Sequence, residues 1–156
     1  MTTRRHFLFF AGGAALSAAA QAQLPANIEA LRKAALAEAV RKVTGGAPVR
    51  PGRVKIEIPP LIDNGNSVPL SVEVQSPMTQ AEHVEAIHVF TEKNPQPWVI
   101  SAHFGPRSGR ARLATRARIA DTGTVMAIAR MSDGSFWSDS VSVVVTLSAC
   151  LEDGLI

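Results

Sequence analysis

The feature that most constrains this chain is the alternation of apolar and polar residues that begins at Arg53 and continues towards the C-terminus. Apolar side chains at every second position indicate strands with one buried face. Turn signals rich in Gly, Pro, Asn and Asp separate these stretches, and no crossover helix is expected between them. The sequence therefore predicts an all-β antiparallel sandwich with a domain over 53–147. Its seven expected strands cover residues 53–58, 68–74, 84–91, 98–104, 112–120, 125–131 and 136–147.

One helix is expected ahead of the strands, over residues 23–46. Basic residues in its last turn and Gly45-Gly46 mark its end. Residues 47–52 are expected to form a linker, since the two prolines in this segment are more typical of a spacer than of a docking motif. Helical spacing predicts one apolar face, made of Ile28, Leu31, Ala35, Ala39 and Val43.

The first 22 residues have the pattern of a twin-arginine signal peptide. Arg4-Arg5 precedes an apolar run, and Ala20-Gln21-Ala22 offers the small residues that a signal peptidase reads. The alternative is a membrane anchor, but the run from Phe7 to Ala20 is shorter than a spanning helix needs. We therefore expect export to the periplasm by the twin-arginine route, with no membrane span left after cleavage.

Cleavage changes the charge of the chain. The net charge of the full chain is +3, and residues 1–22 hold two of its 16 basic residues and none of its 13 acidic ones, which leaves +1. A nearly neutral domain has no general attraction for polyanions, so neither nucleic acid nor an anionic membrane is an expected partner.

No motif for a metal, a cofactor or an enzyme active site stands out. His83, His88 and His103 lack the spacing of a compact ligand set. No Gly-x-Ser-x-Gly elbow and no phosphate-binding glycine loop occurs. We expect a protein that is not an enzyme and holds no cofactor and no metal.

Two further groups of residues have a structural and a functional interpretation. Trp98 and Trp137 could anchor a partner, but a sandwich core also needs large aromatic side chains, and core positions are the expectation. A modest basic cluster could bind an anion, although a solvated strand face explains it more simply. Its members are Arg107, Arg110, Arg112, Arg116 and Arg118.

Cys150 is the only cysteine, so the chain forms no internal disulfide. An exported protein meets an oxidising compartment, where a lone thiol is either buried, bonded to another molecule or kept for reactivity. Cys150 lies just beyond the last expected strand, where chain ends are commonly exposed. From position alone, a reactive and a buried structural role both remain open.

Several fragments together resemble the SoxY sulfur-carrier proteins of bacterial thiosulfate oxidation. No single fragment is diagnostic, but their order and spacing are specific, and the likeness covers nearly the whole chain. The fragments are 58–65 (IPPLIDNG), 68–70 (VPL), 90–95 (FTEKNP), 115–120 (TRARIA), 132–134 (SDG) and 145–147 (VTL).

The resemblance implies an immunoglobulin-like sandwich that pairs with a similar subunit, SoxZ, as a heterodimer. It also implies that a cysteine near the C-terminus, here Cys150, carries sulfur intermediates covalently to the sulfur-oxidation enzymes. The family's cysteine stands in a Gly-Gly-Cys-Gly-Gly arm, whose backbone freedom suits entry into narrow channels. This chain has Ser148-Ala149-Cys150-Leu151-Glu152 instead, and its cysteine tail runs on to residue 156.

Three hypotheses follow. The first is a periplasmic carrier that presents sulfur groups on Cys150 to partner enzymes. The second is an interaction module that pairs with a SoxZ-like chain and no longer carries sulfur. The third is a thiol enzyme, which would need a base beside Cys150 that the sequence does not place.

Overall fold

The computed structural model describes residues 17–147, and their side chains from Ile28 onward. The chain divides into two compact units, residues 1–31 and 32–156. Cys150 and the expected signal sequence up to residue 16 lie outside the described residues. The twin-arginine signal and its cleavage site therefore stay predictions.

The N-terminal helix, α1 (Ser17–Thr44), begins before the expected residue 23 and ends as predicted next to Gly45. Its buried face differs from the predicted one, because Ile28, Leu31 and Ala35 are exposed. The second unit holds the helix from Arg32 onward, and there a short apolar stripe packs against the sheet. The stripe consists of Leu36, Ala39, Val40 and Val43, against Phe90, Ile128 and Phe136.

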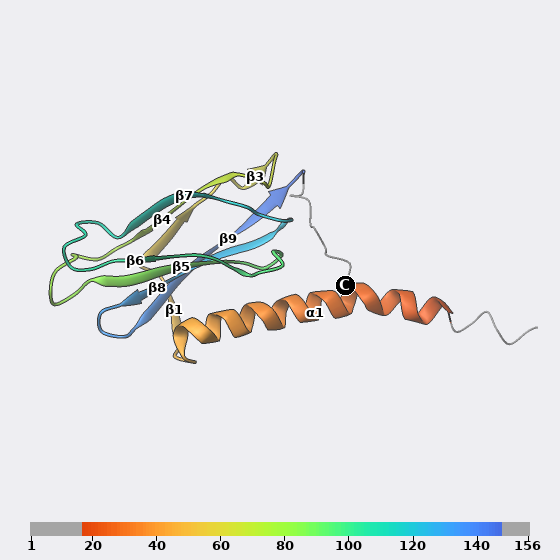
Figure 1. Cartoon of the computed structure of the whole chain (residues 1–156), viewed down its shortest axis with the longest axis horizontal. Helices are drawn as coiled ribbons and strands as arrows, with labels where there is room; N and C mark the ends of the chain where they lie inside the picture. The colour runs from red at the N-terminus through yellow and green to blue at the C-terminus, as the bar shows by residue number, and fades with distance from the viewer. Residues whose placement is uncertain (1–16, 148–156) are drawn as a thin grey trace, which may run out of the picture. The chain divides into compact units, whose positions relative to one another are not determined.

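The strands of the second unit form two sheets (Figure 1). The larger sheet has the order β1-β9-β8-β5-β6, with β3 also paired to β9, and the smaller one has the order β2-β4-β7. The strands are β1 (Val49–Pro51), β2 (Val54–Glu57), β3 (Leu61–Ile62), β4 (Val68–Val74), β5 (Val84–Thr91), β6 (Trp98–His103), β7 (Arg112–Ala117), β8 (Gly123–Met131) and β9 (Phe136–Val145). Each of the seven predicted strands corresponds to one of these.

The core lies between the two sheets, as the alternation predicts. On β4 the buried and less buried positions alternate from Val68 to Val74, and on β2 only Val54 and Ile56 are buried. β5 is buried at nearly every position, because α1 covers its outer face through Phe90. Packing requires this difference, because β2 and β4 have one face towards solvent, whereas β5 is covered on both faces.

Two short strands were not predicted, and both correct the sequence interpretation. The expected linker 47–52 contains β1, which pairs in parallel with β9 through Val49 and Phe136. β3 also pairs in parallel with β9, through Leu61 and Val144. Strand β9 is therefore flanked by β8 on one side and by β1 and β3 on the other, and its valines do not form an unpaired edge.

The turn after β1 is fixed by its backbone. Gly52 has a φ of 108° and Arg53 a φ of 58°, in a region that glycine adopts readily and other residues rarely do. The Gly52 N–H donates to the Ser138 carbonyl at 3.1 Å. The ring of Trp137 lies against the guanidinium groups of Arg50 and Arg53, at 5.7 and 5.1 Å from its centroid. These contacts hold the start of the domain on β9.

Candidate functional site

The described structure reaches to within three residues of Cys150, and it fixes where the cysteine tail begins. β9 ends at Val145, and the next two residues continue to bond the segment around β3. The Thr146 N–H donates to the Ile62 carbonyl at 2.9 Å, and the Leu147 carbonyl accepts from the Gly65 N–H at 3.1 Å. The last described residues are thus held by backbone hydrogen bonds, and the tail starts at a defined point.

A second set of bonds ties this point to the start of β8 and the end of β7. The Gly65 carbonyl accepts from the Ile119 N–H at 2.8 Å, so Gly65 bonds to both Leu147 and Ile119. The Thr122 hydroxyl accepts from the Val145 N–H at 2.9 Å. The exit of the tail therefore lies beside the segment that follows β7.

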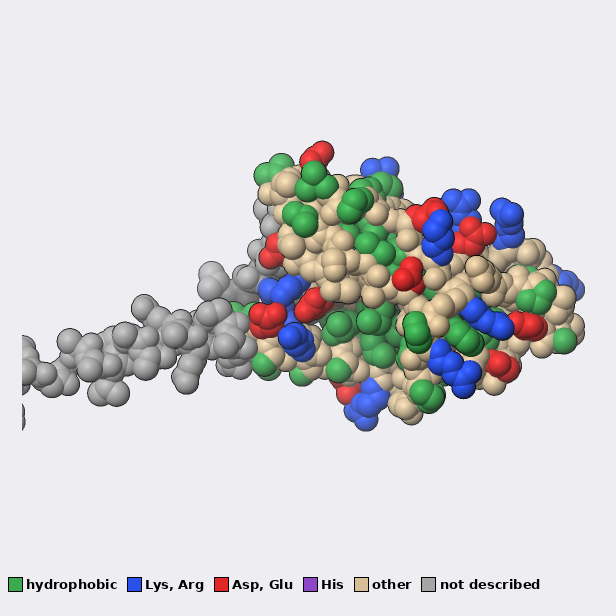
Figure 2. All heavy atoms as spheres, turned by 180° about the vertical axis from the view of Figure 1, so that it is seen from behind, with side chains coloured by type: hydrophobic (Ala, Val, Ile, Leu, Met, Phe, Trp, Pro, Cys, Tyr) green, Lys and Arg blue, Asp and Glu red, His purple; other side chains and the backbone are tan. Residues whose placement is uncertain are grey.

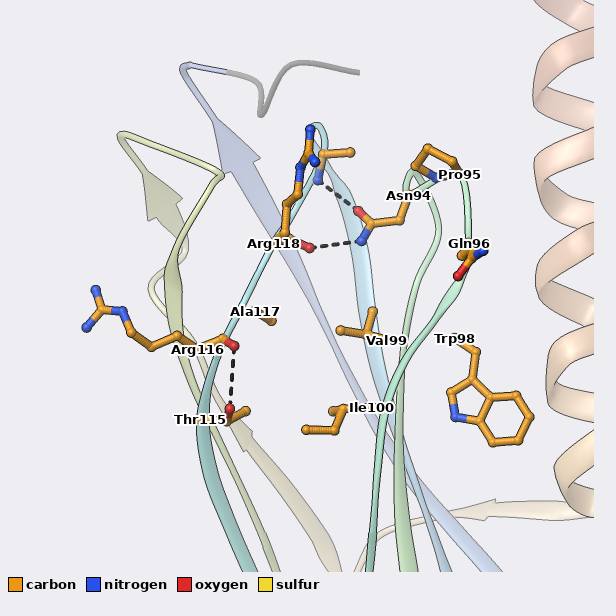
Figure 3. Close-up of a pocket in the computed structure, with 11 residues that line it drawn as sticks. Asn94, Pro95, Gln96, Trp98, Val99, Ile100, Thr115, Arg116, Ala117 and Arg118 are labelled. Carbon is orange, nitrogen blue, oxygen red and sulfur yellow. Dashed lines mark hydrogen bonds between the residues drawn. The ribbon is translucent and has the colours of Figure 1, made fainter. Parts of the chain in front are cut away.

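Asn94 joins the loop between β5 and β6 to the same segment. Its side-chain amide donates to the Arg118 carbonyl at 2.8 Å, and its side-chain oxygen accepts from the Ala120 N–H at 2.8 Å (Figure 3). An asparagine side chain can satisfy a backbone donor and a backbone acceptor together, in the manner of another strand. Asn94 thereby connects loops that belong to the two different sheets.

These bonds bring together four of the fragments that carry the resemblance to SoxY, namely 58–65, 90–95, 115–120 and 145–147. Sequence reasoning did not assign roles to Asn94, Gly65 or Thr122. The Asn94-Pro95 dipeptide was a usable signal, because asparagine in a turn commonly bonds nearby backbone. The other two bonds depend on long-range pairing that no local pattern predicts.

A groove of about 580 Å³ lies between the free edges of the two sheets, β6 and β7 (Figure 3). In the described part of the chain, β6 pairs only with β5 and β7 only with β4, so both strands leave one side of their backbone without a strand partner. Val99 and Ala117 face each other across the groove, and Asn94 lies at one end of it. Val99, Ile100 and Ala117 give the groove some apolar surface, and polar side chains, among them Asn94, Gln96 and Thr115, line the rest.

The five arginines of the predicted basic cluster are exposed, in agreement with a solvated face. Arg116 donates from Nε to the Ser67 hydroxyl at 2.8 Å and points away from the groove (Figure 3). The described surface mixes both signs of charge, and basic and acidic side chains lie close together on the face shown in Figure 2. Among the ion pairs of the described residues, Lys55 Nζ lies 2.8 Å from Glu57 Oε1.

The predicted core placement is wrong for Trp98 and confirmed for Trp137. Trp98 was expected in the core, but it is 40% exposed on the edge strand β6, where its ring contacts those of Phe90 and His88. Trp137 is partly buried and packs against the core, in line with the prediction. The indole N–H of Trp98 donates to the Ser101 hydroxyl at 2.8 Å, which favours this orientation of the ring.

The three histidines do not come together as one set. His88 and His103 have ring centroids 6.2 Å apart, while His83 bonds the Thr79 carbonyl at the far end of β5. Burial, aided by electrostatic repulsion from the nearby His103 and Arg130 side chains, lowers the pKa of His88 to about 4. Among the described residues no group of three His, Cys, Asp or Glu side chains is arranged to hold a metal ion.

Comparison with known proteins identifies the family. A sequence profile described as "Sulfur oxidation protein SoxY" matches residues 40–150, which is most of the chain and ends at Cys150. The chain belongs to the SoxY family. A search of curated protein sequences returned no match. No helix in the described part of this SoxY protein combines the length and hydrophobicity needed to span a bilayer.

The solved structures agree with this assignment. The sulfur carrier protein SoxY from Chlorobium limicola f thiosulfatophilum is 25% identical, with a TM-score of 0.62 over 74% of this chain and 99% of that one. The present chain therefore has the SoxY immunoglobulin-like sandwich, and its family supports a sulfur-carrier role. SoxY as a family implies a SoxYZ complex in general.

Likeness to other structures concerns the fold alone. A superoxide reductase (neelaredoxin) from Ignicoccus hospitalis is 17% identical, with a TM-score of 0.54 over 60% of this chain and 80% of that one. A superoxide reductase from Nanoarchaeum equitans is 13% identical, with a TM-score of 0.51 over 62% of this chain and 100% of that one. At such identities the shared sandwich carries no inference about activity.

Proposed function

We propose that this SoxY protein is a periplasmic carrier, exported by the twin-arginine route, that binds sulfur intermediates covalently on Cys150. The observation that carries the proposal is the match to SoxY over residues 40–150, whose last position is the only cysteine of the chain. The described structure supports it, because the chain leaves the sandwich at Leu147, only three residues earlier. A thiol only three residues beyond Leu147 can react with other proteins while the sandwich itself is bound by a partner subunit.

The chemistry follows from the thiol. The thiolate of Cys150 is the nucleophilic form, and joining it to the sulfur of a reduced sulfur anion makes a sulfur–sulfur bond. That coupling releases two electrons, which an acceptor in the partner enzyme has to take up. Attack by the thiolate of a reductant on this bond returns the free Cys150 thiol. The carrier itself supplies only the attachment point, in agreement with a protein that is not an enzyme.

The partners in this proposal are a SoxZ-like subunit, bound as a heterodimer, and enzymes that act on the carried sulfur. Their substrates are thiosulfate or other reduced sulfur compounds. The sandwich offers the free edges of β6 and β7, and an exposed edge strand is a common site of association. Heterodimer formation is compatible with that arrangement.

One observation favours the second candidate, an interaction module that pairs with SoxZ but carries no sulfur. The residues around Cys150 are Ser148, Ala149, Leu151 and Glu152, in place of four glycines. Glu152 and Asp153 place negative charge near the thiol, which disfavours the thiolate. The state of the cysteine in living cells separates the two candidates.

The test is the intact mass of the exported protein, purified from cells that oxidise thiosulfate. The carrier proposal expects a sulfur-containing adduct that a reductant removes and that a Cys150→Ala variant lacks. Cells grown without a reduced sulfur compound serve as the control. An unmodified thiol in a protein that still copurifies with a SoxZ-like chain would contradict the carrier role and support the interaction module.

A further inference from the structure

We propose that a pocket between the end of α1 and the outer face of the larger sheet binds a tetrahedral oxyanion, such as sulfate or thiosulfate, with His88 Nε2 as its buried hydrogen-bond donor. The pocket has a volume of about 260 Å³ and is lined by side chains from α1, β5, β6 and β8. That volume holds an anion of about five atoms together with a few waters. The lining residues all belong to the second unit, and Cys150 has no role in this site.

Two hydrogen bonds in series determine which nitrogen of His88 carries the proton. The indole N–H of Trp98 can only donate, and it donates to the Ser101 hydroxyl at 2.8 Å. Ser101 Oγ also lies 2.7 Å from His88 Nδ1, which is the one described acceptor left for the hydroxyl proton. His88 Nδ1 therefore accepts. Because burial lowers the pKa of His88 to about 4, the ring is neutral at pH 7 and its single proton is on Nε2.

His88 Nε2 is a donor that the protein itself leaves unpaired. His88 is only 7% exposed, and no described residue forms a hydrogen bond with its Nε2. His88 lines the pocket, whereas Ser101, which bonds Nδ1, does not. The side of the ring away from Ser101 therefore faces the pocket. A buried N–H without an acceptor costs free energy, and a ligand that accepts this hydrogen bond removes the cost.

The charges that line the pocket favour an anion as that acceptor. Lys42 lies in the last turn of α1, and its ammonium group has no partner among the described residues. Glu85 is the one acidic residue in the lining, and its Oε2 lies 2.9 Å from Arg130 Nε, so these two charges cancel. The charge of Lys42 is thus left over. Arg130 and His103 also lower the pKa of His88, which indicates a positive potential at its ring.

The end of α1 works against an anion, and basic side chains offset it. The last turn of a helix carries partial negative charge, and here Arg41 and Lys42 lie in that turn. Val43 and Ala86 give the pocket an apolar part, and the Trp98 ring, turned towards α1, forms another wall (Figure 3). Attraction between charges is stronger beside such surfaces than in open water. A cation would meet like charge here, and an apolar ligand would leave Nε2 unpaired.

NMR of the exported protein with ¹⁵N-labelled histidine tests the donor and the ligand together. At pH 7 the ¹⁵N shifts of His88 should show the proton on Nε2, and the opposite tautomer overturns the proposal. Sodium thiosulfate should shift the His88 resonances saturably, with half-saturation on the order of 1 mM, as expected for so small a ligand. Sodium sulfate is the second arm, and saturation by only one of the two ions identifies that ion as the ligand.

Sodium chloride at matched ionic strength is the control for screening, and it should cause no saturable shift. A thiosulfate and a sulfate response that both rise linearly, or that both equal the chloride response, overturn the site.

A pair of lysine variants tests the assigned charge. Lys42→Gln removes the cation from an exposed position and should raise the dissociation constant about fivefold. Lys33→Gln is the matched control, since Lys33 is exposed on the same helix, nine residues earlier, and does not line the pocket. At 1.5 Å per residue it lies roughly 13 Å further along the axis. Equal weakening by both variants, or none by Lys42→Gln, contradicts the proposal.

This site and the carrier role fail separately. A Cys150→Ala variant should bind thiosulfate as the unaltered protein does, and loss of binding in that variant would place the ion at the cysteine and overturn the pocket. Protein that acquires sulfur on Cys150 in cells but shows no saturable shift at His88 keeps the carrier role and loses the oxyanion site. Protein with a saturable shift that never acquires sulfur keeps the site and loses the carrier role.

Discussion

Replacing Asn94 by Ala should destabilise the sandwich, because one side chain joins the loops of two sheets. The change removes a hydrogen bond to the Arg118 carbonyl and one from the Ala120 N–H, both 2.8 Å long. The first is solvent-exposed, but Ala120 is 2% exposed, so its N–H would be left buried without its partner. At about 1 kcal/mol for each bond, the expected loss in the free energy of unfolding is about 2 kcal/mol.

Urea denaturation followed by tryptophan fluorescence measures this loss. For a domain of this size, the dependence of unfolding free energy on urea is roughly 2 kcal/mol per molar, so the midpoint should fall by about 1 M. Gln96→Ala is the matched control, since Gln96 is exposed in the same loop. Asn94→Asp should lie between the two, because it keeps the acceptor for Ala120 and loses the donor to Arg118. A midpoint for Asn94→Ala within about 0.3 M of the control would refute the reasoning.

Three more expectations concern export, pH and assembly. Replacing both Arg4 and Arg5 by Lys should leave the precursor in the cytoplasm, which fractionation would show; normal periplasmic accumulation would contradict the twin-arginine route. Because burial lowers the pKa of His88 to about 4, below the ordinary 6.5, the unfolded chain takes up this proton first as the pH falls. The stability that His88 contributes is therefore present above about pH 6.5 and is lost progressively between pH 6.5 and 4. A His88→Gln variant should lose less stability than the unaltered protein over that interval in urea titrations; equal losses would show that other groups cause the acid sensitivity. Coexpression with a SoxZ-like subunit should give a heterodimer in light scattering, whereas a monodisperse monomer that captures no such subunit would exclude it.

The seven long strands could be predicted because each carries the alternation that burial of one face requires. On β4 the alternation from Val68 to Val74 is complete, so even its bounds were correct. The short strands β1 and β3 could not be predicted, since three and two residues are too few for a pattern. Their pairing partner, β9, lies more than eighty residues further along the chain, and only the tertiary fold brings it near.

Local sequence patterns also failed to predict the buried face of α1 and several residues of the candidate site. Helical spacing fits several stripes of α1 about equally well, and the sheet selects the one centred on Ala39 and Val40. Trp98 was predicted in the core because of its size. It lies on β6, which is an edge strand, and a local sequence pattern does not predict the order of strands in a sheet. The lone cysteine was found by composition alone. Asn94 and Gly65 were missed, because their backbone partners come from distant loops.

The parallel pairings of β9 also bear on when this domain can fold during synthesis. The Thr146 hydroxyl bonds the Ile62 carbonyl across 84 residues, so a segment made early must wait for nearly the last residue of the sandwich. Contacts of such long sequence separation slow folding, and this sandwich stays open until β9 and Thr146 have left the ribosome. The residue that closes the domain stands four positions before Cys150. A polypeptide cut short anywhere in β9 thus lacks both its closing strand and Cys150, so one truncation removes the closed sandwich and the proposed attachment residue together.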